Sequence, residues 1–342
     1  MKAVVLHAPK DLRLEDREEP APGPNQARVR VGAGGICGSD LHYYFDGGVG
    51  TIRLREPMIL GHEAAGVVEA IGQGVEHVQV GDRVSINPSR PCWACDQCRQ
   101  GTPNRCRDMR FHGSAMRLPH TQGLFREHIT VGAEQLFPLP SETPLGLGAL
   151  AEPFAVALHA ANQADSLYGK RVLVAGAGPI GVLVVIAARF GGAAEIAVTD
   201  IIDPPLAIAR RAGADTVINV ANNGGGLARA AGSGFDIVFE ASGAPPAFRS
   251  GLDALRPGGT IVQIGLGGDA PLPMTLLAAK EITLRGAFRF HEEFGLAVRL
   301  IAERRVDLTP VLTDSIPVAE ADRAFALAAD RSQAMKVQLT FS

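Results

Sequence analysis

Residues 172–181 read Val-Leu-Val-Ala-Gly-Ala-Gly-Pro-Ile-Gly, an apolar run that leads into three spaced glycines and then into an apolar helical stretch. The order strand, G-x-G-x-x-G, helix is typical of the dinucleotide-binding turn of a Rossmann fold. In that turn Gly176 permits the tight bend, Gly178 lets the backbone approach a pyrophosphate at the helix N-terminus, and Gly181 allows close packing of the helix on the strand. The residues of this loop that we expect to bind the cofactor are Gly176, Gly178, Pro179, Ile180 and Gly181.

The next apolar stretch, residues 196–199, ends at Asp200, nineteen residues beyond Gly181. An acidic residue at this point accepts hydrogen bonds from the adenosine ribose of a bound dinucleotide. No arginine adjoins Asp200 in the sequence to pair with a 2′-phosphate, so the pattern favours NAD. NADP stays possible because Arg210 or Arg211, on the helix expected to follow, could reach such a phosphate.

From Arg171 onward, apolar strands alternate with helical segments, and this alternation predicts an α/β fold with a Rossmann doubly wound parallel sheet. The five strands expected are residues 172–175, 195–199, 216–219, 237–240 and 260–264. Beyond them, the pattern indicates a strand over 284–290, a helix over 293–303 and a last strand over 336–341.

Residues 1 to about 145 instead carry short β-type runs separated by glycine and proline, a texture that predicts a β-rich domain with long loops. A chain of 342 residues suits two domains of about 150 to 200 residues each. We expect residues 1–147 to form the first part of a β-rich catalytic zinc domain, 148–288 to form the NAD-binding Rossmann domain, and 289–342 to return to the catalytic domain.

Composition and charge exclude several classes of protein. The chain has 33 Lys and Arg against 36 Asp and Glu, a formal net charge of −3, so the basic surplus of a nucleic-acid binder is absent. Its N-terminus turns polar by Lys10 without the apolar core of a signal peptide, and its longest apolar stretches fall short of the roughly 20 residues that span a bilayer. We therefore expect a cytoplasmic protein that binds neither nucleic acid nor membrane.

Four of the five cysteines crowd into one short loop with the spacing C-x2-C-x2-C-x7-C. Four thiolates on one loop can close a tetrahedron around Zn²⁺ and leave no open position, as a structural site requires. Bacterial iron–sulfur loops share the first two spacings but continue as C-x3-C-P, whereas here the last gap is seven residues and Arg107 follows. The predicted ligands of a structural zinc are Cys92, Cys95, Cys98 and Cys106.

A second set of ligand-type side chains is spread along the chain: Cys37, His62, Glu63 and Glu152. A catalytic zinc needs about three protein ligands and an open position. Cys37, His62 and one of the two glutamates meet that need, and the spacing alone does not choose between the glutamates. With the cysteine loop, this set gives two zinc ions per subunit.

Around these residues the sequence resembles the zinc-containing medium-chain dehydrogenases. Residues 61–75 match the zinc motif of that family, G-H-E-x2-G-x5-G-x2-V, and Gly81-Asp82-Arg83-Val84 follows where the family has it. The resemblance covers essentially the whole chain and implies a GroES-like catalytic domain beside the Rossmann domain. It also implies a homo-oligomer, since family members are commonly dimers or tetramers.

The resemblance implies roles for particular side chains. In the polyol branch of the family, the inner ligands correspond to Cys37, His62 and Glu63, while Glu152 holds the metal-bound water or coordinates the metal directly. Ser39 occupies the position of the hydroxyl that touches the reacting oxygen, and His42 that of the proton shuttle toward solvent. Together, Ser39, His42 and Glu152 are the candidate catalytic residues beside the metal.

Within the polyol branch, the loops at 42–44, 86–92, 109–116 and 284–290 resemble those of the L-idonate 5-dehydrogenases. That likeness implies a sugar acid or polyol substrate and the reversible oxidation of L-idonate at C5 to 5-keto-D-gluconate. Tyr43 and, for the carboxylate, Arg289 or Arg110 are the candidate substrate residues, because the planar fork of arginine can grip both carboxylate oxygens. Sorbitol, xylitol, L-threonine or simple alcohol dehydrogenases remain alternatives, as does a non-catalytic crystallin-like or quinone-reductase-like relative without metal.

Overall fold

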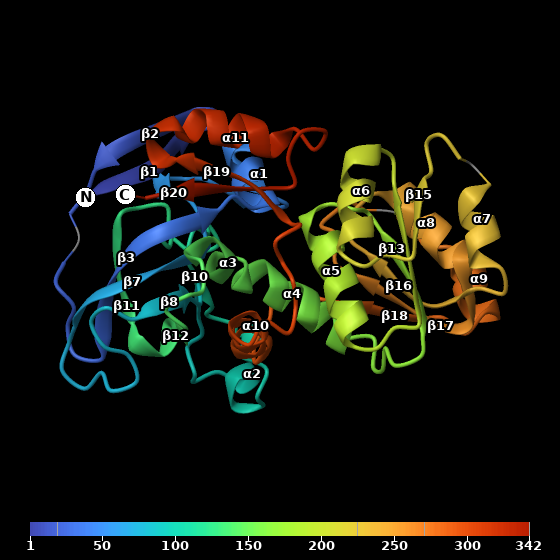
Figure 1. Cartoon of the computed structure of the whole chain (residues 1–342), viewed down its shortest axis with the longest axis horizontal. Helices are drawn as coiled ribbons and strands as arrows, with labels where there is room; N and C mark the ends of the chain where they lie inside the picture. Colours follow the sequence, from blue (N-terminus) through green and yellow to red (C-terminus); the bar gives the residue numbers. More distant parts are fainter. Residues whose placement is uncertain (19, 224, 270, 342) are drawn as a thin grey trace.

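The computed structural model describes residues 1–18, 20–223, 225–269 and 271–341. Figure 1 shows two bodies side by side, a β-rich one that contains both termini and an α/β one, with α4 and α10 where they meet. Within the described ranges, every helix is too short or too polar to cross a membrane.

The α/β body is a six-stranded parallel sheet in the order β15-β14-β13-β16-β17-β18. Its strands are β13 (Arg171–Ala175), β14 (Glu195–Asp200), β15 (Thr216–Asn219), β16 (Phe235–Glu240), β17 (Leu255–Gln263) and β18 (Thr283–Gly286). Its helices are α5 (Pro179–Phe190), α6 (Asp203–Arg211), α7 (Gly226–Ala231), α8 (Pro245–Ala254) and α9 (Met274–Ala279).

Alternate residues of β13 pack into two different apolar cores, as a strand covered on both faces requires. Val172 and Val174 belong to a core with α5, whereas Leu173 packs with Phe248 and Leu252 of α8. This arrangement confirms the predicted α/β fold with a doubly wound parallel sheet.

The β-rich body is built on a seven-stranded sheet with the path β12-β8-β7-β3-β20-β19, to which β11 adds by pairing with β3. Its strands are β3 (Gln26–Gly35), β7 (Glu63–Ile71), β8 (Arg83–Ile86), β11 (His128–Gly132), β12 (Leu136–Leu139), β19 (Leu312–Pro317) and β20 (Lys336–Thr340). A smaller sheet pairs β1 (Lys2–Ala8) with β2 (Asp11–Asp16) and β6 (Met58–Ile59). Because β20 pairs antiparallel with β3, the last strand of the chain returns to the sheet that residues 26–35 begin.

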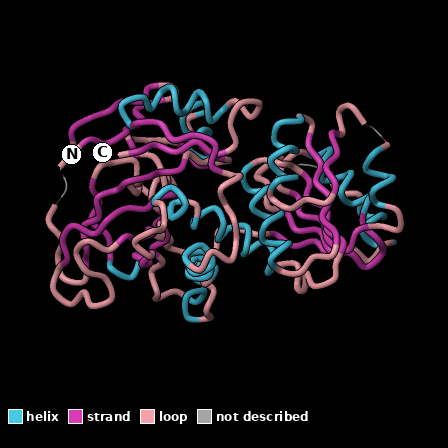
Figure 2. The backbone as a smooth tube through the Cα atoms, viewed as in Figure 1, coloured by secondary structure: helices cyan, strands magenta, loops and turns pink. Residues whose placement is uncertain are grey.

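The remaining elements cover or join these sheets (Figure 2). The helices are α1 (Gly38–Asp46), α2 (Asp96–Arg99), α3 (Leu145–Ala149), α4 (Ala151–Asn162), α10 (Glu293–Ala302) and α11 (Ala321–Ala329), with 3₁₀ turns η1 (Pro103–Arg105), η2 (Ala133–Gln135) and η3 (Val318–Glu320). Two short ladders join β4 (Gly48–Val49) to β5 (Ile52–Arg53) and β9 (Ser89–Arg90) to β10 (Arg110–Phe111).

One predicted element is wrong in extent. The strand expected over 284–290 ends at Gly286, and residues 287–290 form a loop in which Arg289 has a positive φ of 58°. A left-handed backbone cannot continue a β-strand, so the apolar run Ala-Phe-Arg-Phe belongs to a turn. This turn directs Arg289 toward the β-rich body.

Candidate functional site

Two turns of the chain bring Cys37, His62 and Glu63 together. Cys37 is the N-cap of α1, two residues after the end of β3, while Glu63 begins β7 and lies opposite Gly35 in the ladder between these strands. The ligand atoms of Cys37, His62 and Glu63 lie within 4.8 Å of one another. A thiol, an imidazole and a carboxylate at this separation are a donor set that fits Zn²⁺.

Asp40 holds two members of this group in place. Its completely buried carboxylate accepts hydrogen bonds from the backbone N–H groups of Cys37, at 2.9 Å, and of Gly61, at 3.0 Å. One of its oxygens lies 3.8 Å from Nδ1 of His62. Burial lowers the pKa of His62, but the Asp40 carboxylate and Cys37 raise it by more than burial lowers it. The pKa of His62 therefore lies well above its ordinary value. Asp40 therefore fixes the backbone next to two of the candidate ligands, Cys37 and His62, as the partners of metal ligands do.

Lys336, on the final strand, supplies a cation on the other side of the group. Its Nζ donates to Oε1 of Glu63 at 2.7 Å and to the carbonyl of Ile36 at 3.1 Å, and both charged side chains are buried. The second oxygen of Glu63 has no hydrogen-bond partner among the described residues. A Cβ at Gly35 would lie 2.1 Å from that oxygen, so only glycine leaves room for the carboxylate.

Glu152, at the start of α4, and Arg289 face the same region. Burial raises the pKa of Glu152 to about 7, against the opposing influence of His62. Burial lowers the pKa of Arg289 to about 10, although Glu152 and Tyr43 act to raise it. The Arg289 guanidinium stands 4.4 Å from the ring centre of Phe111, whose ring lies 5.5 Å from that of His62. Arg289 is thus a half-buried cation close to the candidate metal group.

The other predicted catalytic and substrate residues lie at different depths. Ser39 is half-buried in the first turn of α1, whereas His42, in the same helix, is exposed and has its Nδ1 3.0 Å from Asp46. Tyr43 is buried, and its hydroxyl accepts a hydrogen bond from the backbone of Ala115. Arg110 is exposed on β10, and since Phe111 beside it is buried toward His62, the structure does not bring Arg110 into this group.

The four-cysteine loop forms a compact cluster of its own. The sulfur atoms of Cys92 and Cys106 lie 3.5 Å apart, those of Cys95 and Cys98 3.6 Å apart, and those of Cys95 and Cys106 4.0 Å apart. Four thiolates at the usual Zn–S distance occupy tetrahedron corners about 3.8 Å apart. Backbone N–H groups of Arg107 and Cys98 lower the pKa of Cys95 to about 6 and so favour the thiolate. The cluster fits a closed zinc site.

The glycine loop connects β13 to α5 as the motif requires. Gly176 has φ of +102°, Gly178 is the N-cap of α5, and a Cβ on Gly181 would lie 1.9 Å from the carbonyl of Gly176. A Cβ on Gly178 would meet nothing within 4 Å, so the N-terminus of α5 is open to a pyrophosphate. The loop fits a dinucleotide. Asp200 ends β14 and accepts a 2.7 Å hydrogen bond from the backbone N–H of Ala177 within the loop.

No arginine adjoins Asp200 in the sequence, but one lies beside it in the structure. Arg331, from the loop after α11, donates to Oδ2 of Asp200 at 2.6 Å. No pattern in the sequence could indicate this contact, because 131 residues separate the two side chains. Arg210 instead donates to the carbonyl of Asp215.

Two further residues of the site, Asp40 and Lys336, were not predicted from the sequence. Asp40 lies inside the motif that contains Cys37 and Ser39, and its lone acidic charge near a predicted ligand was a usable signal. Lys336 is a single cation in the otherwise uncharged run 334–341, which indicates a buried charge with a partner.

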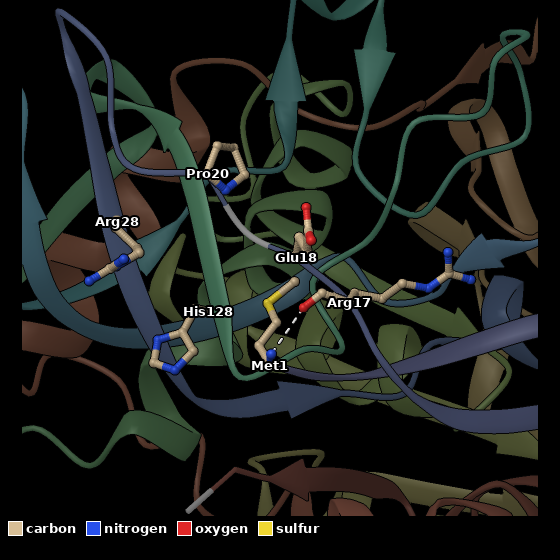
Figure 3. Close-up of a pocket in the computed structure, with 6 residues that line it drawn as sticks. All are labelled: Met1, Arg17, Glu18, Pro20, Arg28 and His128. Carbon is tan, nitrogen blue, oxygen red and sulfur yellow. Dashed lines mark hydrogen bonds between the residues drawn. The ribbon is translucent and has the colours of Figure 1, made fainter.

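A larger hollow, of about 570 Å³, opens elsewhere on the β-rich body (Figure 3). It is lined by Met1, Arg17, Glu18, Pro20, Arg28 and His128. None of the candidate ligands or cofactor residues borders it. A hollow of about 420 Å³ lies at the carboxyl ends of β16 and β17, where ligands bind in open α/β sheets.

Comparison with known proteins identifies the class. Residues 23–141 match the alcohol dehydrogenase GroES-like domain, and residues 179–303 match the zinc-binding dehydrogenase domain. The chain belongs to the zinc-binding alcohol dehydrogenase family, it is an oxidoreductase, and zinc and NAD(P) are its cofactors. This confirms the family resemblance and the prediction of a GroES-like domain.

The chain is also similar to individual members of the family over nearly its whole length. L-idonate 5-dehydrogenase (NAD(P)(+)) of Escherichia coli K12 is 43% identical over 93% of this chain and 92% of its own. The crystal structure of the E. coli L-idonate 5-dehydrogenase has a TM-score of 0.91 and covers 99% of this chain and 98% of its own. Human sorbitol dehydrogenase is 35% identical over 94% of this chain and 91% of its own. A structure from Sinorhizobium meliloti 1021 with bound NADP has a TM-score of 0.91 at 28% identity, covering 99% of each chain.

Proposed function

We propose that this dehydrogenase oxidises L-idonate at C5 to 5-keto-D-gluconate, reversibly and with NAD(P). The observation that carries the proposal is the half-buried Arg289 guanidinium near the Cys37, His62 and Glu63 group, in a chain 43% identical to an L-idonate 5-dehydrogenase. The second candidate is a neutral polyol such as sorbitol or xylitol, which the 35% identity to sorbitol dehydrogenase favours.

Cys37, His62 and Glu63 would hold the catalytic zinc, with Glu152 beside it, and Cys92, Cys95, Cys98 and Cys106 would hold the structural zinc. When bound, the catalytic zinc supplies a Lewis acid for the reacting hydroxyl, and NAD(P) accepts the hydride. Asp40 and Lys336 hold the imidazole and carboxylate of the ligand group in position. Two ions per subunit follow from this assignment.

Ser39 and His42 would carry the proton of the substrate hydroxyl to solvent. They stand three residues apart on α1, so their side chains lie on one face of the helix. The half-buried Ser39 leads toward the exposed His42, whose imidazole contacts the carboxylate of Asp46. This gradient of exposure supports a path from the site outward.

Arg289 would bind the carboxylate of the substrate, and Tyr43 would line the same space. Rings of Phe111 and Phe288 lie 4.4 and 4.9 Å from the guanidinium carbon, and Nη2 donates to the sulfur of Met116 at 2.9 Å, so none of these contacts supplies a negative charge. A bidentate carboxylate offers such an arginine the charge-assisted hydrogen bonds that the rings do not. Arg110 is the weaker candidate because it is exposed and away from the group.

The cofactor would lie across the glycine loop formed by Gly176, Gly178, Pro179, Ile180 and Gly181, with its adenosine ribose at Asp200. We assign residues 148–288 to this cofactor domain, and residues 1–147 with 289–342 to the catalytic domain. Asp200 favours NAD, while NADP remains a possible cofactor.

We place the protein in the cytoplasm as a dimer or tetramer. None of the five cysteines forms a disulfide, which suits a reducing compartment. Large apolar side chains are exposed on and near the edge strand β18, which supports pairing with a second copy along this edge: Leu266, Leu272, Met274 and Leu284. Size-exclusion chromatography with light scattering on Leu284→Glu tests this, because the variant should shift to a smaller species.

Steady-state kinetics of Arg289→Ala on L-idonate and on sorbitol test the substrate proposal. We expect kcat/KM for L-idonate to fall at least about tenfold more than kcat/KM for sorbitol, because only the acid loses a charged partner. Arg110→Ala is the matched control and should affect both substrates alike. An equal loss on both substrates in Arg289→Ala would assign that arginine to general positioning and remove this support for idonate.

A further inference from the structure

Asp200 is saturated with hydrogen-bond donors before any cofactor binds. The backbone N–H groups of Ile201 and Ile202 donate to Oδ1, at 2.7 and 3.3 Å, and the N–H of Ala177 and the guanidinium of Arg331 donate to Oδ2, at 2.7 and 2.6 Å. A carboxylate has about four lone-pair positions, so these four donors use them all. A ribose hydroxyl can reach Asp200 only if one donor gives way.

Arg331 is the donor that can leave. The other three donors are backbone groups of residues 177, 201 and 202, which are fixed at the ends of β13 and β14. Arg331 comes instead from the loop that follows α11 in the other body, which Figure 1 shows on the side nearest α5 and α6. Its side chain is 46% exposed, whereas that of Asp200 is 4% exposed.

We propose that Arg331 determines cofactor choice: it gives up Asp200 when the adenosine ribose binds and pairs with the 2′-phosphate when the cofactor is NADP. The proposal rests on the NAD(P)-linked activity and extends it to a residue outside the Rossmann domain. In NAD, the 2′-hydroxyl has to compete with Arg331 for the carboxylate. In NADP, a guanidinium already beside the 2′ position offsets the repulsion between Asp200 and the phosphate.

The arginines nearer in sequence are less well placed for this role. Arg210 is engaged with the carbonyl of Asp215 at 2.8 Å, and Arg211 is exposed at the end of α6. Arg331 already lies within hydrogen-bond distance of the carboxylate that receives the ribose. It also brings a charge from the catalytic body to the adenosine end of the cofactor site.

Calorimetric titration of the purified protein with NAD and with NADP, without any sugar substrate, tests the proposal. We expect Arg331→Ala to raise the ratio Kd(NADP)/Kd(NAD) by roughly tenfold or more, with Kd for NAD unchanged or lower. The matched control is Arg323→Ala, an exposed arginine of α11 that pairs with Glu320 and should leave the ratio unchanged. Arg331→Lys, which keeps a positive charge but loses the planar fork, should raise the ratio less than Arg331→Ala.

An unchanged Kd(NADP)/Kd(NAD) in Arg331→Ala overturns the proposal. If both dissociation constants rise equally, Arg331 only stabilises the contact between the two bodies, and the proposal is also overturned. Failure of the parent protein to bind NADP also overturns it. If Arg331→Ala does not fold, Kd(NADP)/Kd(NAD) is measured on Arg331→Lys and Arg331→Gln instead. The proposal requires this ratio to be higher in Arg331→Gln, which has no positive charge, than in Arg331→Lys. Since no sugar is present, a wrong substrate assignment does not affect the result.

Discussion

Lys336→Met tests whether the buried lysine compensates the charge of Glu63 beside the catalytic zinc group. The two side chains are 3% and 0% exposed, and their charged atoms lie 2.7 Å apart. Without Lys336, Oε1 of Glu63 loses this cation, while Oε2 already lacks a hydrogen-bond partner among the described residues. Deleting one partner of a buried ion pair costs about 3–5 kcal/mol, so we expect a loss of stability of that size.

The assay is urea unfolding monitored by far-UV circular dichroism. The free energies of unfolding are compared between variants that share the same m-value, the slope of that free energy against urea concentration. Lys2→Met is the matched control, because its partner Asp16 is 77% exposed and a solvated pair contributes little to stability. The double variant Glu63→Gln/Lys336→Met should recover part of the loss, since neither charge is then buried. The reasoning is refuted if Lys336→Met loses no more stability than Lys2→Met.

Three further predictions concern acid stability, metal retention and the cysteine loop. Burial opposes ionisation of Glu293, but hydrogen bonds led by that from His159 lower its pKa from 4.5 to about 2, which is worth about 3 kcal/mol at neutral pH. The ionised carboxylate stabilises the fold above pH 4.5 and loses this effect as the pH falls toward 2. Glu293→Gln should therefore lower Tm at pH 7 and roughly half as much at pH 3, because pH 3 still lies above the pKa of the folded state; a constant difference would contradict this. Asp40→Asn should weaken zinc binding at the Cys37 group by about 10–100-fold, so that zinc per subunit after dialysis falls from two to one; retention of both ions would count against an orienting role. Cys98→Ser should lower Tm before any selective loss of turnover, because a closed zinc site contributes to folding stability, and a Tm equal to that of the parent would argue against such a site.

Local patterns were enough to predict most of the fold. The glycine loop at 176–181 and the apolar run before it predicted β13, the turn and α5, because each element is specified by neighbouring residues. The strand over 284–290 failed for the converse reason. Alternating apolar residues predict a strand, but Arg289 is placed by its contact with the ring of Phe111, far away in the sequence.

Some residues of the candidate site could likewise be predicted from local sequence, and others could not. Its ligand-type residues could be selected from the sequence because their chemistry is scarce and their spacing is characteristic. The sequence could not predict which charged residues pair with them. Lys336 pairs with Glu63 and Arg331 with Asp200, across 273 and 131 positions of the chain. Which charges meet across such distances depends on sheet pairing, here the antiparallel register of β20 on β3, and on how the two bodies pack.

The most direct test of the proposed function is the ratio of kcat/KM for L-idonate to kcat/KM for sorbitol, measured with NAD on the zinc-replete protein. A half-buried arginine beside the metal group should favour the acid, so we predict a ratio above about ten, the gain expected of one charge-assisted pair. A ratio of one or less would contradict the idonate assignment and leave a dehydrogenase of neutral polyols.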